Sequence, residues 1–159
     1  LSARPGTSPT MSADSKPAVS YWHLWTDEHG ASRQTHCEMT EFQKAPIQPE
    51  SAPQWIGTQT KGNATVFVTV LPPGWVGEWH ENPKPQWILP MSGRWFVESM
   101  DGQRVEMGAG ELSFGEDQNT RKVDGRKGHL SGTVGDEPAV LMIVQLEAIA
   151  GPSSPCRFR

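Results

Sequence analysis

The chain has few of the features that mark nucleic-acid-binding or membrane-spanning proteins. Its 14 Lys and Arg residues are outnumbered by 18 Asp and Glu residues, which gives a net charge of -4. Nucleic-acid binding needs a basic stripe, whereas the most basic run here, residues 121–127, is broken by Asp124 and Gly125 and indicates a solvated loop. The longest apolar run, residues 139–144, is far shorter than the roughly 20 residues of a membrane span. We therefore expect neither nucleic acid nor a membrane as a partner.

Cysteine is also scarce, with Cys37 and Cys156 near opposite ends of the chain. This spacing predicts neither a disulfide framework nor a metal knuckle, and it favours a reducing, cytoplasmic location. Residues 1–20 lack an apolar segment and are rich in Ser, Pro and Ala, which predicts a disordered tail rather than a signal peptide. Residues 1–10 are expected to be foreign to the native chain, with Met11 as its natural start. We expect one domain over residues 21–149 and a flexible C-terminal tail over residues 150–159.

Frequent glycine and proline predict short strands and exclude long helices. The chain has 16 glycines and 14 prolines, and no segment shows a helical period. The prolines within residues 45–53 predict an extended connection, and Asp101-Gly102 predicts a hairpin turn. Strands are expected at residues 21–26, 34–42, 64–71, 94–99, 104–107, 111–114, 129–134 and 139–147. About eight short strands of this kind indicate an all-β sandwich or barrel.

Residues 74–93, GWVGEWHENPKPQWILPMSG, are the part of the chain most indicative of function. Successive side chains of a strand face opposite sides, so His80, Asn82 and Gln86 share one parity. Pro83 and Pro85 cannot donate to a sheet ladder, which makes the piece between His80 and Gln86 an edge, a bulge or a short loop.

The spacing of this stretch resembles the first signature of the cupin family, G-x5-H-x-H-x3/4-E-x6-G. Gly74, His80 and Gly93 match it, while Asn82 replaces the second His and Gln86 replaces the Glu. The second signature is matched weakly, from Gly110 onward, with Glu116 where proline is usual and Arg121 near the histidine position. The resemblance is to small single-domain cupins with substituted metal ligands. It implies a double-stranded β-helix, or jelly-roll barrel.

The resemblance also raises the question of a metal cofactor, because three His and one Glu hold Fe, Mn, Ni or Zn in cupins. Neutral amides bind such metals poorly, so a site in this chain needs replacement ligands. The candidate metal ligands are His80, Gln86 and His129, with a carboxylate from Glu116 or Asp117. The cofactor is accordingly either none or one divalent metal.

A second hypothesis requires no metal and assigns acid/base chemistry to the same residues. His80 and His129 are candidates for general base and acid, because imidazole titrates near neutral pH, and Glu116 or Asp117 is a candidate proton donor. The candidate substrate-binding residues are Asn82, Gln86, Trp79, Trp87, Trp95, Arg94 and Arg121. Core packing and turn roles remain the alternative for the tryptophans, for Gln86 and for the two carboxylates.

Three functions follow, and the leading one is a small cupin lyase or isomerase. It would decarboxylate, dehydrate or cyclise a small organic acid or a polyketide-like metabolite. The alternatives are a metal-dependent dioxygenase or decarboxylase and a non-catalytic barrel that binds a sugar or metabolite. A homodimer is expected, with the aromatic strand at residues 21–25 as its contact.

Overall fold

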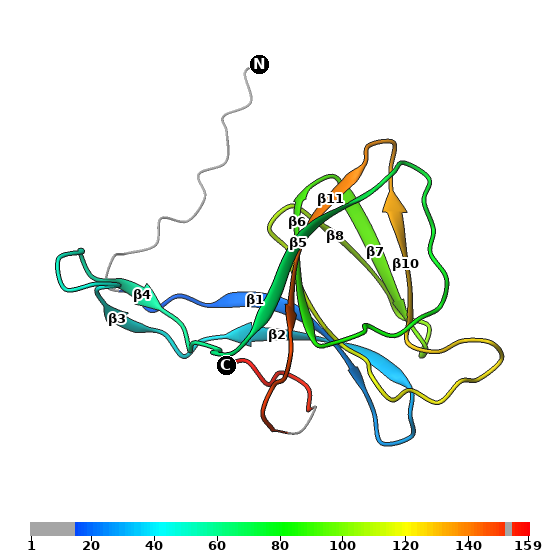
Figure 1. The fold of residues 1–159 in the computed structure, drawn as a ribbon, viewed down its shortest axis with the longest axis horizontal. Helices are drawn as coiled ribbons and strands as arrows, with labels where there is room; N and C mark the ends of the chain where they lie inside the picture. The colour runs from blue at the N-terminus through cyan, green and yellow to red at the C-terminus, as the bar shows by residue number, and fades with distance from the viewer. Residues whose placement is uncertain (1–14, 152–153) are drawn as a thin grey trace, which may run out of the picture.

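The computed structural model describes residues 15–151 and 154–159, which form eleven β-strands and no helix (Figure 1). No helix able to cross a membrane is therefore found in the described part of the chain. The strands are β1 (Val19–Thr26), β2 (Ser32–Met39), β3 (Gln43–Ala45), β4 (Gln54–Ile56), β5 (Ala64–Leu71), β6 (Gln86–Ser92), β7 (Arg94–Ser99), β8 (Arg104–Gly108), β9 (Leu112–Glu116), β10 (His129–Val134) and β11 (Ala139–Leu146).

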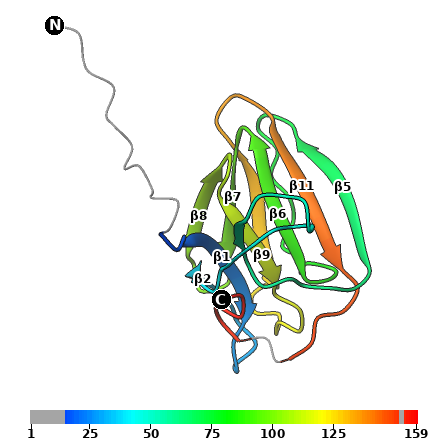
Figure 2. The ribbon, with the colours of Figure 1, turned by 90° about the vertical axis from the view of Figure 1, so that its left-hand side faces the viewer.

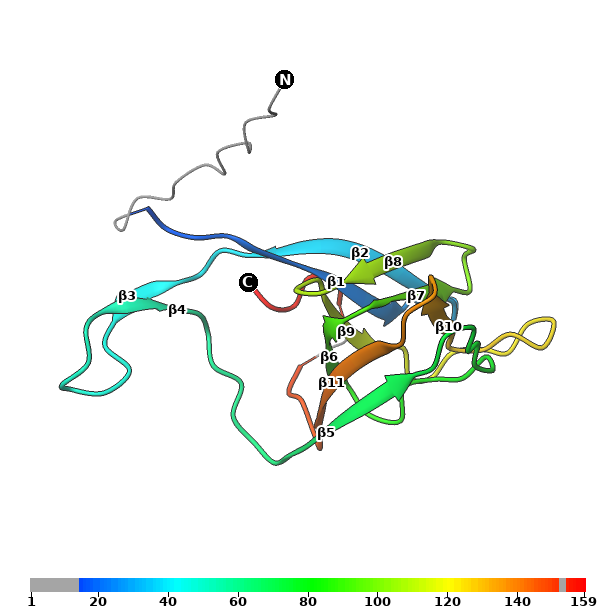
Figure 3. The ribbon, with the colours of Figure 1, turned by 90° about the horizontal axis from the view of Figure 1, so that it is seen from above.

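Most strands lie where the residue pattern predicts them. β5 and β7 match their predicted bounds, and the β7–β8 hairpin turns through Asp101 and Gly102 as expected. Three strands are additional to those expected: β6, and also β3 and β4, which pair with each other on either side of the proline-containing residues 46–53. The prolines occupy the loop between these two strands, where no ladder donor is lost. The resulting hairpin projects from the rest of the molecule (Figure 3).

Two sheets lie face to face and enclose the main core (Figure 2). The larger sheet has the order β2-β1-β9-β6-β11-β5, and the smaller has the order β10-β7-β8. Between them lie the buried residues Leu24, Leu71, Ile88, Trp95, Val97, Val105, Met107, Ala139, Leu141 and Ile143. The alternation of strand side chains places these residues inward, and burying apolar surface there drives the sheets together. The predicted all-β fold is confirmed.

The aromatic strand β1 lies in the interior of the larger sheet. It pairs with β2 on one side and runs parallel to β9 on the other. Tyr21, His23 and Leu24 are buried within this chain. The strand is therefore not an edge, and these three side chains are not available to a second copy.

A second apolar cluster covers the outer face of the larger sheet. Tyr21, Phe114 and Leu146 are buried there, and Trp87 and Phe158 pack against them. Phe158 comes from the C-terminal segment: its carbonyl accepts a hydrogen bond from the Tyr21 hydroxyl at 2.9 Å, and its N–H donates to the same oxygen at 3.0 Å. The segment therefore acts as a cover over this part of the sheet.

The same cover is attached covalently by a disulfide between Cys37 and Cys156. The expectation that the two cysteines stay apart is wrong. They are 119 residues apart in sequence, but β2 and the C-terminal segment meet at the outer face of the sheet. The cytoplasmic location stays a prediction, and cysteine usage no longer supports it.

The predicted tails are only partly within the described residues. Residues 1–14, including Met11, lie outside them, and β1 begins at Val19, inside the predicted N-terminal tail. At the other end, Cys156 and Phe158 make the contacts given above. The flexibility of residues 150–159 concerns motion and stays a prediction.

Candidate functional site

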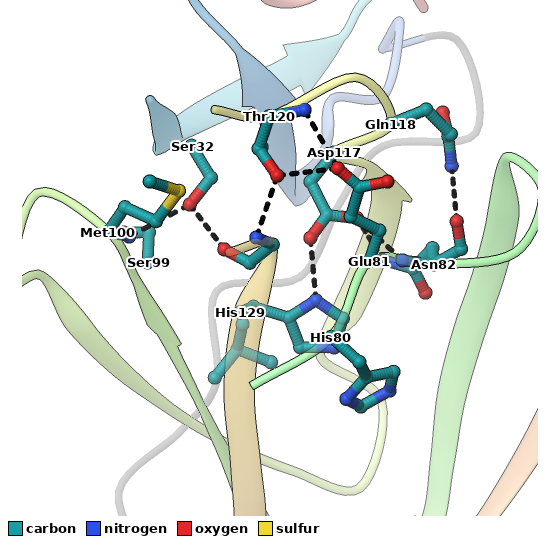
Figure 4. A network of polar contacts seen from close by, with 12 residues as sticks. Ser32, His80, Glu81, Asn82, Ser99, Met100, Asp117, Gln118, Thr120 and His129 are labelled. Atoms are coloured by element: carbon teal, nitrogen blue, oxygen red, sulfur yellow. Dashed lines mark hydrogen bonds and ion pairs between the residues drawn. The ribbon is translucent and has the colours of Figure 1, made fainter. Parts of the chain in front are cut away.

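His80 and His129 lie side by side because their backbones pair. The N–H of each donates to the carbonyl of the other, at 3.0 and 2.9 Å, in an antiparallel bridge that adds the end of the 74–80 segment to β10. Residues paired in this way point to the same face. The two ring centroids are 4.6 Å apart, with His129 buried and His80 exposed (Figure 4). One ring therefore belongs to the interior and its neighbour opens to solvent.

Asp117 holds His129 from inside the protein. Its Oδ2 lies 2.7 Å from Nδ1 of His129, and its Oδ1 accepts hydrogen bonds from the backbone N and the Nδ2 of Asn82, at 2.9 and 2.8 Å. Burial alone raises the pKa of Asp117, but the hydrogen bonds from His129 and Asn82 and the charge of His129 outweigh it and lower that pKa. An ionised carboxylate only accepts, so Nδ1 of His129 carries a proton and the neutral ring has a free lone pair on Nε2.

Asn82 and Gln86 extend this network and do not point into open space. Nε2 of Gln86 donates to Oδ1 of Asn82 at 2.6 Å, and Oε1 of Gln86 accepts from Nε2 of Gln145 at 2.9 Å. Asn82 and Gln86 are buried. A Cβ at Gly115 of β9 would lie 2.3 Å from Nδ2 of Asn82, so this strand needs glycine to leave room for the amide. Asn82 therefore holds Asp117 in place and Gln86 holds Asn82, while their predicted role in substrate binding stays a prediction.

A second set of polar contacts closes the loop between β9 and β10. Oε2 of Glu81 accepts from the N and the Oγ1 of Thr120, at 2.8 and 2.5 Å, and Oγ1 of Thr120 accepts from the N–H of Gly128 at 2.9 Å. The carbonyl of Gly128 accepts from the hydroxyl of Ser32 at 2.6 Å. These bonds fix the residue directly before His129 (Figure 4).

Gly128 is essential to the approach of the two histidines. Its φ is +62°, and a Cβ there would lie 2.2 Å from the carbonyl oxygen of His80. We expect Gly128→Ala to lower the free energy of unfolding by about 2–4 kcal/mol, through left-handed strain and this clash. Urea unfolding followed by tryptophan fluorescence measures the loss.

The matched control is Gly125→Ala in the same loop. Gly125 has a φ of +78°, but nothing lies within 4 Å of a Cβ placed there. The free energy of unfolding of this variant should fall only by the cost of the left-handed backbone conformation, about 1–2 kcal/mol. Equal losses in the two variants would show that the close approach at His80 is unimportant.

Glu116 is not part of the His80–His129 site. It faces the outer side of the sheet, where its Oε1 lies 2.9 Å from Nε2 of His23 and its Oε2 pairs with Arg157. The N–H of Cys156 donates to Nδ1 of His23 at 3.1 Å, so Nε2 carries the proton that Glu116 accepts. Side chains alternate along β9 and just beyond it, which sends Glu116 outward and Asp117 inward. Of the two predicted carboxylates, only Asp117 contacts a histidine of this site, namely His129.

Most of the other predicted substrate-binding residues lie elsewhere. Trp87 belongs to the outer cluster and Trp95 to the main core. Arg94 lies beside Glu111, with Nη1 3.9 Å from Oε1, and Arg121 is exposed in the loop after β9. Trp79 is the sequence neighbour of His80, and the guanidinium of Arg126 lies 5.3 Å from its ring centroid.

The residues present do not fit the metal site that the family resemblance implies. His80 and His129 offer two imidazole nitrogens, but both polar atoms of the Gln86 side chain are hydrogen-bonded to other amides, and Glu116 faces away. Within residues 15–151 and 154–159, no cluster of three or more His, Cys, Asp or Glu side chains is arranged to hold a metal ion. The predicted ligand set of His80, Gln86 and His129 is therefore not assembled.

Several members of the site were not predicted from the sequence. Glu81 has the opposite parity to His80, and Gln145 lies at the end of an otherwise apolar strand. A polar residue in such a strand is a usable signal, because a buried amide requires a partner. Arg126 and Thr120 give no comparable signal, since both lie in a polar loop whose path depends on tertiary contacts.

No family model matches the chain, and no curated protein matches it. Several solved structures are similar. Protein NMB1881 from Neisseria meningitidis is 16% identical, with 65% of this chain and 88% of that chain covered and a TM-score of 0.40. A cupin domain from Bordetella pertussis is 20% identical, with 58% and 93% covered and a TM-score of 0.39. The oxalate decarboxylase of Bacillus subtilis, which has Mn(II) centres, is 23% identical, with 68% of this chain and 29% of that chain covered and a TM-score of 0.38. The fold is all-β with cupin-like structural matches.

Proposed function

We propose that this protein is a small-molecule enzyme of the lyase or isomerase type that moves protons with His129 and His80. The observation that carries the proposal is the buried Asp117 carboxylate bound to Nδ1 of His129 at 2.7 Å. Such a contact orients an imidazole and fixes its tautomer without itself taking the proton. A structural role alone does not require the second, exposed histidine at 4.6 Å.

The two rings are equipped to exchange protons with a bound molecule. Nδ1 of His80 lies 2.6 Å from the carbonyl of Glu78, which can only accept, so this nitrogen donates and Nε2 of the neutral ring is free. Nε2 of His129 is free for the reason given above. One ring, in its neutral form, accepts at Nε2 a proton from the carbon next to a carbonyl group, and the other ring, in its protonated form, supplies a proton from Nε2 elsewhere on the same molecule. Isomerisation and dehydration require both of these proton transfers, and decarboxylation requires only the second, which protonates the enolate left by loss of CO2.

A small organic acid is the proposed substrate class, because a basic side chain lies on the loop that leads into His129. Arg126 is exposed and lies against Trp79, the neighbour of His80 in sequence. A guanidinium binds a carboxylate through parallel hydrogen bonds, and the indole limits its range of positions. We therefore assign to Arg126 the carboxylate-binding role predicted for Arg94 and Arg121.

The proposal is tested by proton exchange, which does not require the natural substrate. 2-Oxoglutarate and acetoacetate are incubated with the protein in D2O, and loss of the protons next to the carbonyl is followed by 1H NMR. His129→Gln is expected to lower the exchange rate of the wild-type protein by at least about 100-fold. His29→Gln, which changes an exposed turn histidine, is the matched control and should retain the rate.

Chelation separates the proposal from a metal-dependent reaction. If the two rings act without a metal, exchange survives dialysis against EDTA, and metal analysis of untreated protein finds less than one ion per chain. Loss of exchange on chelation, restored by Mn(II) or Fe(II), would favour the metal-dependent oxygenase or decarboxylase. Binding of the keto acids without any exchange would favour a non-catalytic binding protein.

A further inference from the structure

The C-terminal cover leaves part of the outer face of the larger sheet open. The strands β9, β6 and β11 are interior strands of that sheet. Phe114 and Leu146 are buried on this face together with Phe158 of the cover, whereas Trp87 and Val144 are only half-buried. Apolar side chains in the middle of a sheet normally pack against a second layer of the protein. The described part of the chain provides that layer only in part.

The open part of this face is a pocket with a volume of about 420 Å³. Sites for small molecules typically have volumes of roughly 300–1000 Å³. Trp87 and Leu89 of β6, Leu112 of β9 and Val144 of β11 line it from the sheet. The size of the pocket therefore suits a small molecule.

Three further parts of the chain border the pocket. Met39 comes from the end of β2, and Phe158 comes from the C-terminal cover. Thr58 and Thr60 lie on the connection from β4 to β5, which swings away from the sheet and returns to it (Figure 3). Phe158 is held by its two hydrogen bonds with the Tyr21 hydroxyl, so this border of the pocket is fixed before any ligand arrives.

The residues that line the pocket favour an uncharged ligand. Nine described residues line it, and none of the nine is charged. The polar groups of their side chains are the hydroxyls of Thr58 and Thr60 and the indole N–H of Trp87. A charged molecule would lose its water here without gaining a partner of opposite charge, which costs free energy.

The aromatic side chains at the pocket favour a ring. The ring centroid of Phe158 lies 4.9 Å from that of Trp87 and 4.7 Å from that of Phe114, in tilted and edge-to-face arrangements. Aromatic rings at such distances attract one another. A ring of the chain itself is thus already packed beside the pocket, and Trp87 and Phe158 also line the space that remains open.

We propose that this pocket binds a small uncharged aromatic molecule. The pocket belongs to the outer face of the larger sheet, whereas Asp117 and the core between the two sheets lie on the inner side. The proposed proton chemistry at His129 uses none of the residues that line the pocket. The two proposals therefore stand or fail independently.

The test is the binding of N-phenyl-1-naphthylamine, an uncharged aromatic fluorophore, followed by energy transfer from tryptophan. Binding is expected to saturate at one probe per chain. Val144→Glu places a carboxylate on the floor of the pocket and is expected to raise the dissociation constant at least about 10-fold. Val123→Glu is the matched control: Val123 is 53% exposed, on the loop between β9 and β10, and this variant should bind the probe like the wild-type protein.

Leu89→Glu provides an independent second variant, and far-UV circular dichroism confirms that each variant is folded. Competition defines the class of ligand. Naphthalene should displace the probe, while 1-naphthoate and 1-naphthylmethylammonium should each compete at least about 10-fold more weakly. The cationic competitor shows that repulsion from the net charge of the chain, which is -4, is not the cause.

Saturable binding that both pocket variants weaken and Val123→Glu retains is the supporting result. Absence of saturable binding, or equal affinity in a folded Val144→Glu variant, would overturn the proposal. Equal competition by the charged naphthalenes would overturn the ligand class. Sedimentation of the protein with phosphatidylcholine vesicles without saturable probe binding would show a membrane-binding face instead. A doubled mass with loss of probe binding at higher protein concentration would show that a second copy covers the pocket, and this result would also overturn the proposal.

Discussion

Asp117→Ala is expected to lower the free energy of unfolding by about 3–5 kcal/mol at pH 7, because three buried donors lose their common acceptor. Asp117 is fully buried and satisfies Nδ1 of His129 together with the N–H and the side-chain amide of Asn82. Removing the carboxylate leaves these three donors in the interior without their acceptor. Urea unfolding followed by tryptophan fluorescence measures the difference. Asp136→Ala, in the exposed turn before β11, is the control and should change stability little.

The same residue predicts how stability depends on pH. The pKa of Asp117 is lower in the folded protein than its ordinary value, so its ionisation stabilises the fold above the ordinary pKa, near 4. That contribution is lost as the pH falls through the lowered pKa. The stability gap between the wild-type protein and Asp117→Asn should therefore be full at pH 7 and narrow as the pH falls below about 4. A gap of equal size at pH 7 and pH 2.5 would contradict this account of the carboxylate.

Loss of the disulfide is expected to have an effect of similar size. Cys37 and Cys156 are separated by 119 residues, and a crosslink over a loop of that length lowers the entropy of the unfolded chain by an amount worth about 4–5 kcal/mol at 25 °C. Cys156→Ala also weakens the cover on the outer face, since the N–H of residue 156 itself donates to His23 and Phe158, two residues further on, contacts Tyr21. The free energy of unfolding of this variant should be lower by about that amount.

A reducing agent provides the control for this prediction. Unfolding of the wild-type protein in the presence of TCEP should move toward that of Cys156→Ala, while the variant itself should not respond. If TCEP leaves the wild-type transition unchanged although mass spectrometry shows two free thiols, the crosslink does not stabilise the fold. A protein isolated with both thiols free would contradict the pairing itself.

The order of the strands along the chain could be predicted because strand signals are local. β-branched residues, alternation and turn residues mark β5, β7, β8, β10 and β11 within a few positions of their bounds. The β3–β4 hairpin was missed because its strands are three residues each and carry no alternating pattern. The spacing around His80 likewise identified the histidine that lies at the surface of the site.

The composition of the site could be predicted only in part. Glu116 and Asp117 are neighbours of the same chemical type, and the sequence offered no way to choose the face of the sheet to which each belongs. The sequence shows that Leu112, Phe114 and Glu116 share one face of the strand and that Ser113, Gly115 and Asp117 share the other. It does not show which face is which, because Leu112 and Ser113 can each lie on either face of the sheet. The structure shows that both faces are covered, one by the smaller sheet and one by the C-terminal segment.

The sequence by itself determined the all-β fold, the positions of most strands and the prominence of His80, since each depends on residues close together in the chain. The tertiary structure decided which distant residues meet: Asp117 with His129, Glu116 with His23 and Arg157, and Cys37 with Cys156. These contacts depend on how the two sheets and the C-terminal segment bury their apolar faces. Because burial is a property of the packed molecule, no local pattern in the sequence specifies these contacts.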